Sequence, residues 1–433
     1  MLASFLRRFS ADHRGNVAVI FALALVPGIF LIGMGMDFSS AIQKKSKLNA
    51  ATDAAALAAV TPAMLTQSNT AALTAATNMF NAVASGISGL NYNPPTVTIS
   101  NAGLVRTVTV SYTASSVNNF PSVLGQQTWS ISGASQATSS TAPNINFYLL
   151  LDNSPSMAIA ATTAGINAMV AATPTQGGCA FACHESHPSG DNLGNPGGVD
   201  NYTLANELGV VTRIENMATA TQSLMTTASS TEQANNATYQ MAIYTFNYSG
   251  ISTTQTLTSN LTIAQNSAKN IDVLEVYDNS YLTSTNDNND TDTNFESAMS
   301  QINGIMPNPG TGASTSTPQE VLFIVSDGVD DEVSGTCSQP LDGTRCQQPF
   351  NTTSCTTVKN RGIMIAVLYT AYLPLPTNSW YNTWISPFQS QISTNMQNCA
   401  SPGLFFSVTT DGDITAAMQA LFQQAVAAAR LSQ

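Results

Sequence analysis

The sequence predicts an α/β protein whose large domain contains a doubly wound, mostly parallel sheet, preceded by an N-terminal transmembrane helix and a small α+β module. Three observations lead to this fold class. An uncharged apolar run fills residues 17–36, segments with period-two alternation follow, and from Pro143 onward apolar strands alternate with helical patterns. Alternation of strands and helices is typical of a parallel sheet that carries helices on both faces.

The first element is a candidate membrane helix. Val17 to Met36 is a run of 20 residues without a charged side chain, which is the length that crosses the hydrocarbon core of a bilayer as a helix. Helical spacing continues without Gly or Pro as far as Val60, so residues 17–61 are expected to form a membrane helix with an extension outside the membrane. The run is longer than the apolar core of a signal peptide and lacks a clear cleavage site, which favours a retained anchor.

The orientation of this helix is suggested by its flanking charges. Three arginines in or near residues 1–16 favour a cytoplasmic N-terminus, although Lys44, Lys45 and Lys47 follow on the other side. Because these charges nearly balance, the orientation also depends on the cysteines considered below.

Residues 62–141 are expected to form the small α+β module. Ala71 to Ala84 has a helical pattern, and Pro94-Pro95 breaks it. Alternation of polar and apolar residues then predicts half-buried strands at 96–100, 105–112 and 128–132. Ser135 to Thr141 is predicted to be a linker.

The large domain is expected to occupy residues 142–433. We predict strands at 145–151, 239–247, 321–326, 363–369 and 404–408, with helices near 205–229, 294–306 and 412–430. A Gly- and Pro-rich insertion at about 174–204 interrupts this pattern. Sheets of this kind bind ligands at the carboxyl ends of their strands.

Polar oxygen-bearing residues follow two of these strands. Asp152, Ser154 and Ser156 come directly after the first strand, and Asp327 comes directly after the third. Thr293 stands before a predicted helix between them. Carboxylates and hydroxyls together are suited to a hard divalent cation such as Mg²⁺.

In this order the three pieces resemble the metal-ion-dependent adhesion site of von Willebrand factor type A domains. The resemblance implies that Asp152, Ser154, Ser156, Thr293 and Asp327 hold Mg²⁺, or else Mn²⁺ or Ca²⁺, and leave one position for an acidic group of a protein partner. Thr291 is an alternative to Thr293. The competing interpretation is a vestigial site whose residues only cap helices.

The N-terminal segment resembles a second family. Residues 14–23, the pair Met36-Asp37 and the alanine-rich stretch 48–59 are similar to TadG-like proteins of tight-adherence (Flp) pilus systems. The resemblance implies a pilus assembly or adhesion factor anchored in the inner membrane of a bacterium, with its large domain in the periplasm. Gly15 is not followed by the glutamate of a prepilin site, so we expect no cleavage there.

All six cysteines follow the membrane helix on the same side: Cys179, Cys183, Cys337, Cys346, Cys355 and Cys399. An even number in an extracytoplasmic domain favours disulfides. Cys179 with Cys183 is the expected first pair, and the other four are expected to restrain the loops after the Asp327 strand. Zinc binding with His184 and His187, or haem attachment at Cys179-Cys183-His184, are the alternatives, although the two cysteines are separated by three residues instead of the two of a haem motif.

Charge and motifs narrow the possible functions. Residues 49–433 hold seven basic and 23 acidic side chains, so nucleic-acid binding is not expected. The sequence contains no nucleophile elbow, phosphate-binding loop or His-Glu-x-x-His motif. We therefore expect a binding protein without enzymatic activity, with a metal-independent envelope scaffold or a periplasmic redox or haem protein as alternatives.

Overall fold

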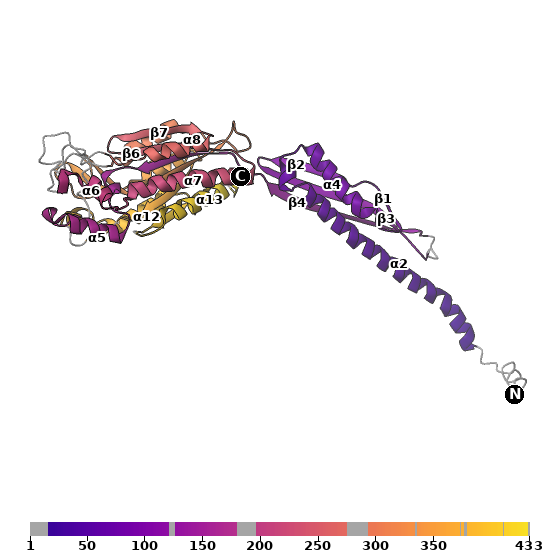
Figure 1. The fold of residues 1–433 in the computed structure, drawn as a ribbon. Coiled ribbons are helices and arrows are strands. Elements are labelled where there is room, and N and C mark those ends of the chain that lie inside the picture. Colours follow the sequence, from indigo (N-terminus) through magenta and orange to yellow (C-terminus); the bar gives the residue numbers. More distant parts are fainter. Residues whose placement is uncertain are drawn as a thin grey trace, which may run out of the picture. The chain divides into compact units, whose positions relative to one another are not determined.

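The computed structural model describes residues 16–120, 126–179, 196–274, 293–333, 336–372, 374–375, 379–409 and 411–431. Figure 1 shows the chain as a ribbon. It divides into two compact units, Met1–Thr141 and Ala142–Gln433.

The N-terminal unit begins with the long helix α2, Asn16–Ala58. Its residues 17–32 are exposed except for the half-buried Gly28, and from Gly33 onward one face is buried against the rest of the unit. Within the described residues, this is the one helix that is long and apolar enough to cross a membrane. The extension of the apolar helix beyond the membrane run agrees with the sequence prediction.

A small antiparallel sheet and two further helices complete the unit. The helices are α3, Pro62–Leu65, and α4, Asn69–Ala84. The strands are β1, Leu90–Tyr92; β2, Thr96–Ala102; β3, Val105–Val117; and β4, Thr128–Ser140. β3 pairs with β4 along its whole length and with β1 and β2 on its other edge. Leu48 of α2 and Phe80 of α4 pack with Val108, Val110 and Tyr112 of β3 in one core.

The prediction of a linker at Ser135–Thr141 is wrong. β4 continues to Ser140, which pairs with Val105, and only Thr141 lies beyond the strand. The small polar residues of this stretch look like a linker by composition. They form a strand because β3 offers a full edge of backbone donors and acceptors that must be paired.

The C-terminal unit is built on a six-stranded sheet with the order β12-β11-β8-β5-β6-β7. The strands are β5, Ile145–Asp152; β6, Tyr239–Asn247; β7, Gly250–Thr258; β8, Gln319–Ser326; β11, Met364–Thr370; and β12, Phe405–Val408. All neighbouring strands are parallel except β7, which is antiparallel to β6. A separate hairpin consists of β9, Val329–Val333, and β10, Arg345–Pro349.

Helices cover both faces of this sheet. They are α5, Thr163–Ala172; α6, Asn201–Glu207; α7, Arg213–Asn235; α8, Leu261–Ser267; α9, Phe295–Ile305; α10, Thr352–Lys359; α11, Ser379–Trp384; α12, Gln389–Cys399; and α13, Ile414–Leu431. Short 3₁₀ turns occur at Pro155–Ala158, Pro174–Gln176, Pro196–Gly198 and Ala268–Asn270.

Two separate cores show that the sheet is doubly wound. Phe147, Leu149 and Leu151 pack with α7, α8 and α13 in one core. Tyr148 and Leu150, which point to the opposite face, pack with α9, α10 and α12 in the other. The predicted fold class is confirmed.

The helix predicted near 205–229 is instead two helices. α6 ends at Glu207 and α7 begins at Arg213. Gly209 separates them with φ of 68°, a left-handed backbone conformation that ends a helix. The edge strand β7 and the β9–β10 hairpin were not predicted, because their polar residues give no apolar pattern.

Candidate metal centre

The loop after β5 is shaped by the Asp152 carboxylate. β5 is buried at every position and lies between β8 and β6, so Asp152 ends a central strand. Its Oδ1 accepts hydrogen bonds from the backbone N–H of Ser154 at 3.0 Å and from the Ser154 hydroxyl at 2.6 Å. The hydroxyl oxygens of Ser154 and Ser156 are 3.1 Å apart. One carboxylate and two hydroxyls therefore gather at this strand end.

The end of β8 adds a second carboxylate. The Ser326 hydroxyl donates to Asp152 Oδ2 at 2.5 Å and accepts from the backbone N–H of Gly328 at 3.0 Å. Asp327 is buried, and its Oδ1 accepts from the backbone N–H of Val329 at 3.4 Å. Burial raises the pKa of Asp327, although a hydrogen bond with Ser156 opposes this shift. The structure thus brings together four of the five predicted residues: Asp152, Ser154, Ser156 and Asp327.

Thr293 reaches the same edge of the sheet through its backbone. Its N–H donates to the carbonyl of Asp331 at 2.9 Å and its carbonyl accepts from Asp331 at 2.8 Å. The next residue, Asn294, donates to the carbonyl of Asn247 at the end of β6. Thr293 is buried, but within the described residues no hydrogen bond joins its hydroxyl to the other four side chains. Thr291 lies outside the described residues.

The two carboxylates are electrostatically costly. Burial, and then the charge of Asp327, raise the pKa of Asp152 to about 7, although hydrogen bonds from Ser154 and Ser326 oppose the shift. Burial also raises the pKa of Asp327. Asp327 Oδ2 is buried without a hydrogen-bond partner in the structure. Either a proton or a nearby cation would reduce the free-energy cost of burying these two carboxylates.

Arg213 is one such cation, and it was missed by the sequence reasoning. It is the first residue of α7, it is buried, and its Nη1 lies 3.9 Å from Asp327 Oδ2. Its Nη2 donates to the carbonyl of Ala371 at 3.0 Å. At 3.9 Å the charges attract without a hydrogen bond. Arg213 could have been singled out from the sequence because few basic residues follow position 48. Ser326 could have been singled out because it directly precedes Asp327.

The donor set fits a hard divalent cation. Its atoms are carboxylate and hydroxyl oxygens, which Mg²⁺, Mn²⁺ and Ca²⁺ prefer. The open Asp327 Oδ2 adds a buried negative charge that a cation would compensate. Within the described residues no group of three or more His, Cys, Asp or Glu side chains could hold a metal. A metal at this edge would therefore depend on the serine and threonine hydroxyls.

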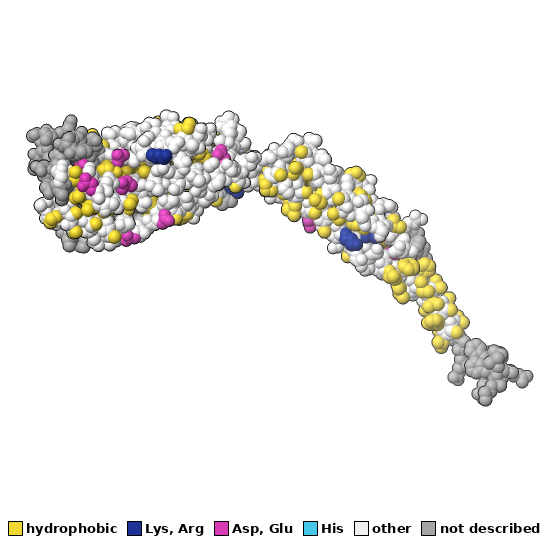
Figure 2. Space-filling view, in the orientation of Figure 1, with side chains coloured by type: hydrophobic (Ala, Val, Ile, Leu, Met, Phe, Trp, Pro, Cys, Tyr) yellow, Lys and Arg dark blue, Asp and Glu magenta, His cyan; other side chains and the backbone are white. Residues whose placement is uncertain are grey.

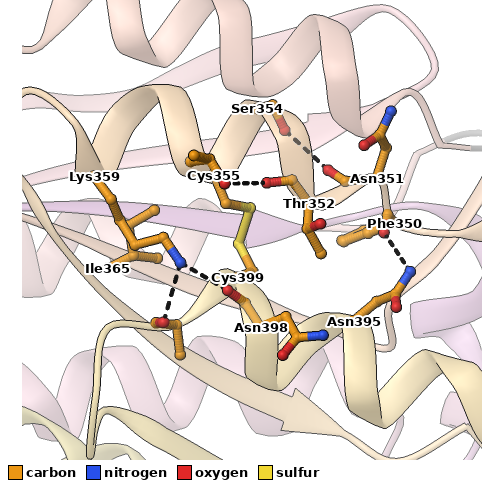
Figure 3. Close-up of a disulfide and its surroundings, with 12 residues drawn as sticks. Phe350, Asn351, Thr352, Ser354, Cys355, Lys359, Ile365, Asn395, Asn398 and Cys399 are labelled. Atoms are coloured by element: carbon orange, nitrogen blue, oxygen red, sulfur yellow. Dashed lines mark hydrogen bonds between the residues drawn. A yellow bond between two sulfur atoms is a disulfide. The ribbon is translucent and has the colours of Figure 1, made fainter.

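The cysteines form disulfides, as predicted. Cys337 is bonded to Cys346, with 5.6 Å between the Cα atoms, and this bond restrains the β9–β10 hairpin after Asp327. Cys355 of α10 is bonded to Cys399 of α12, with 5.2 Å between the Cα atoms (Figure 3). Cys179 is also disulfide-bonded. Its predicted partner Cys183, with His184 and His187, lies outside the described residues.

Comparison with known proteins identifies the N-terminal segment. Residues 15–64 match the Tad family, described as "Putative Flp pilus-assembly TadE/G-like". This segment of the chain is therefore similar to that family. The match covers all of α2, and it confirms the resemblance noted in the sequence. No curated protein sequence matches the chain.

Several solved structures are similar to the chain at low identity. The von Willebrand factor domain of the type V pili tip protein Mfa5 from Porphyromonas gingivalis has a TM-score of 0.38 and 9% identity, covering 67% of this chain and 97% of that one. The pilus adhesin SpaC from Lactobacillus rhamnosus GG has a TM-score of 0.35 and 12% identity, covering 79% of this chain and 34% of that one. Proximal thread matrix protein 1 from the mussel byssus, with a zinc-occupied MIDAS motif, has a TM-score of 0.33 and 12% identity, covering 66% of this chain and 46% of that one. This chain therefore spans about a third of SpaC and about half of the byssus protein.

Proposed function

We propose that this protein is a membrane-anchored pilus assembly or adhesion factor whose C-terminal unit binds a protein partner through a divalent cation. The cation, Mg²⁺ or else Mn²⁺ or Ca²⁺, would be held by Asp152, Ser154, Ser156, Thr293 and Asp327. It would supply an open coordination position for an acidic side chain of a pilus or envelope component. The main observation in support is the buried cluster of carboxylate and hydroxyl oxygens, in which Asp327 Oδ2 has no hydrogen-bond partner.

The family match and the disulfides support the proposed location. The TadE/G-like segment coincides with α2, the one helix in the described part of the chain that could cross a membrane. The disulfides at Cys179, Cys337–Cys346 and Cys355–Cys399 favour an oxidising compartment. We therefore propose an inner-membrane anchor with a cytoplasmic N-terminus and a periplasmic C-terminal unit.

The protein's own residues would have different tasks at this site. Asp152 would orient Ser154 through two hydrogen bonds, and the Ser154 hydroxyl lies 3.1 Å from the Ser156 hydroxyl. Ser326 orients Asp152 without itself being a proposed ligand. Because Asp152 and Asp327 bring two negative charges, one divalent cation would balance them and remain able to attract a carboxylate from a partner.

A metal titration of the full chain tests the proposal. Purified protein in detergent is unfolded thermally in EDTA and with added Mg²⁺ or Mn²⁺. Wild type should gain about 2.7 kcal/mol at a hundredfold excess of metal over its dissociation constant. Asp152→Ala should lose this gain. Ser326→Ala removes the hydrogen bond to Asp152 and the acceptor of the Gly328 N–H but no proposed ligand, so it should keep most of the gain.

A partner assay then tests the role of the metal. Pull-down from envelope extracts should recover a pilus or envelope protein in Mg²⁺ and not in EDTA, and Asp152→Ala should fail to restore piliation to a deletion strain. Restoration of piliation by Asp152→Ala would favour the metal-independent scaffold. The metal-independent scaffold has structural support of its own, because the Arg213 guanidinium already faces Asp327.

A further inference from the structure

The β3–β4 hairpin of the N-terminal unit ends beside the apolar part of α2. The strands close at Asn118, whose backbone N–H donates to the carbonyl of Gln127 at 2.9 Å. Phe120, just beyond, lies against the helix, because a Cβ placed on Gly33 would be 2.9 Å from the Phe120 Cβ. Gly33 belongs to the uncharged run of 20 residues that ends at Met36. Asn119 and Phe120, which we call the hairpin tip, therefore lie beside a part of α2 that belongs to the apolar run.

Asp37 holds the hairpin tip in this position. Its Oδ1 accepts from the backbone N–H of Asn119 at 2.8 Å, and its Oδ2 accepts from the backbone N–H of Phe120 at 3.0 Å. The side chain is 2% exposed. Gly33 and Asp37 are four residues apart and lie on the same face of α2. Asp37 is the first charged residue after the apolar run. It thus uses both carboxylate oxygens to hold Asn119 and Phe120 against one turn of α2.

With α2 as the proposed membrane anchor, the length of the apolar run places Gly33 inside the membrane. The part of the helix from Val17 to Ile32, which is exposed except for the half-buried Gly28, is about 24 Å long at 1.5 Å per residue. The hydrocarbon core is about 30 Å thick. A helix that fills the core must continue to about Met36, which gives about 30 Å. Gly33 then lies within the core near its edge, and Phe120 lies at a similar depth.

The side chains around the tip suit a lipid interface. Phe120 is 46% exposed although it is a large apolar residue. Val117, three residues earlier in the chain, and Met36 and Phe38 of α2 are also exposed. Phe38 packs edge-on against Trp129 of β4, with 5.7 Å between the ring centroids. Trp and other aromatic residues are enriched where a membrane protein crosses the interface. In Figure 2 hydrophobic side chains surround the N-terminal part of α2 and continue to the edge of the module.

We propose that the Phe120 side chain, at the end of the described part of the β3–β4 hairpin, inserts into the bilayer beside α2. The inference depends on the membrane anchor of the proposed function. Lipid is the occupant because the exposed Phe120 side chain is continuous with the apolar face of the membrane helix. The module then contacts the membrane at two points, the helix and the hairpin, and its tilt against the bilayer is restrained.

Fluorescence quenching in vesicles tests this position. Full-length Phe120→Trp is reconstituted into vesicles of phosphatidylethanolamine and phosphatidylglycerol, and its emission above wild type is measured. Nitroxide-labelled lipids, with the label near the headgroup end of the acyl chain, should quench the added emission more than aqueous iodide does. The matched control is Leu73→Trp on α4, where Leu73 is 44% exposed. Leu73 lies near Asn69, which contacts Asn101 at the far end of the β2–β3 pair, so iodide should quench it more than the lipid label does.

The outcomes separate this inference from the proposed function. Quenching of Phe120→Trp by iodide, as for Leu73→Trp, would place the tip in water and overturn the inference. Protection from both quenchers would mean that protein, such as a second copy of the chain, covers the tip, and this also overturns it. In both cases flotation of the protein with the vesicles would leave the anchor intact. Failure to float with them would instead reject the anchor and the proposed function together.

Discussion

Each of the two units buries carboxylates, but their surroundings differ. In the N-terminal unit, both oxygens of Asp37 accept backbone hydrogen bonds. In the C-terminal unit, Asp152 and Asp327 lie in one cluster, and Asp327 Oδ2 has no hydrogen-bond partner. The first arrangement uses a carboxylate to hold two segments together. The second leaves a carboxylate oxygen without a hydrogen bond, faced by Arg213 at 3.9 Å, and a hard cation can stabilise such an oxygen.

The largest expected effect concerns the support of the Asp327 loop. Gly328 has φ of 79°, and a Cβ there would lie 2.7 Å from Ile392 Cγ2, so α12 packs directly on the residue after Asp327. The Cys355–Cys399 disulfide ties α12 to α10 across a separation of 44 residues. Replacing both cysteines by Ala should lower the free energy of unfolding by about 4 kcal/mol through the loss of loop closure. Denaturant unfolding under oxidising conditions measures this loss.

The second disulfide is the matched control. Cys337–Cys346 closes only nine residues, so its removal should cost about 2.6 kcal/mol by the same relation. It should also reduce metal-induced stabilisation less, because it does not hold α12. If both double variants lost the same stability and the same metal response, the packing of α12 on Gly328 would have no special role at the site.

The next prediction concerns Asp37, whose two carboxylate oxygens both accept hydrogen bonds. Asp37→Ala leaves the N–H groups of Asn119 and Phe120 without their acceptor, at an expected cost of about 2–3 kcal/mol to the N-terminal unit. Hydrogen exchange of the full chain in nanodiscs should show faster exchange at these two amides. Asp37→Asn keeps one acceptor oxygen and should lie between Ala and wild type. Unchanged exchange in Asp37→Ala would show that the backbone holds the hairpin tip without the carboxylate.

These two regions also differ in how far the sequence predicts them. Asp152, Ser154, Ser156 and Asp327 each follow an apolar strand, and the carboxyl ends of parallel strands meet at one edge. Local pattern therefore suffices to propose their grouping. The contacts of Asp37 join residues 82 and 83 positions apart, and no periodicity relates a helix position to the tip of a distant hairpin.

The same reasoning explains the errors in the fold. The buried strands β5, β6, β8 and β11 were predicted because continuous apolar runs are typical of a parallel sheet. β7 and the polar part of β4 were missed because they are held by pairing with a neighbour, which composition does not report. Arg213 was missed for a related reason, since it reaches Asp327 only through the packing of α7.

A third, smaller effect asks whether Arg213 competes with a metal. Arg213→Met removes the charge facing Asp327 and should lower stability in EDTA by about 1–2 kcal/mol, the attraction across 3.9 Å less the cost of burying the guanidinium. Its gain on adding Mg²⁺ should exceed that of wild type, because the cation then replaces the missing charge. Thermal unfolding with and without Mg²⁺ measures both quantities.

Arg361→Met is the control for this variant. Arg361 donates to Asn303, Met306 and Asn308 in another loop, so its loss should lower stability and leave the Mg²⁺ gain unchanged. A smaller Mg²⁺ gain in Arg213→Met than in wild type would contradict competition. It would show that Arg213 helps to shape the site.

The last prediction concerns Glu320, a buried carboxylate at the opposite end of β8 from Asp327. The Asn146 amide donates to its Oε1 at 3.0 Å and its Oε2 is unpaired. Burial raises the pKa of Glu320 to about 8 from an ordinary value of 4.5, so between these pH values the folded state holds a proton that the unfolded state has released. Stability should therefore fall as pH rises from 5 to 8, and Glu320→Gln should reduce the slope by at most about 1.4 kcal/mol per pH unit. Asp330, whose pKa burial also raises to about 8, should keep part of the slope in this variant.

Because Glu320 lacks the hydroxyls that surround Asp327, Mg²⁺ should leave the difference between Glu320→Gln and wild type unchanged. A difference that vanished in Mg²⁺ would mean that an unpaired buried carboxylate suffices to respond to the metal, and the contrast with Asp327 would fail.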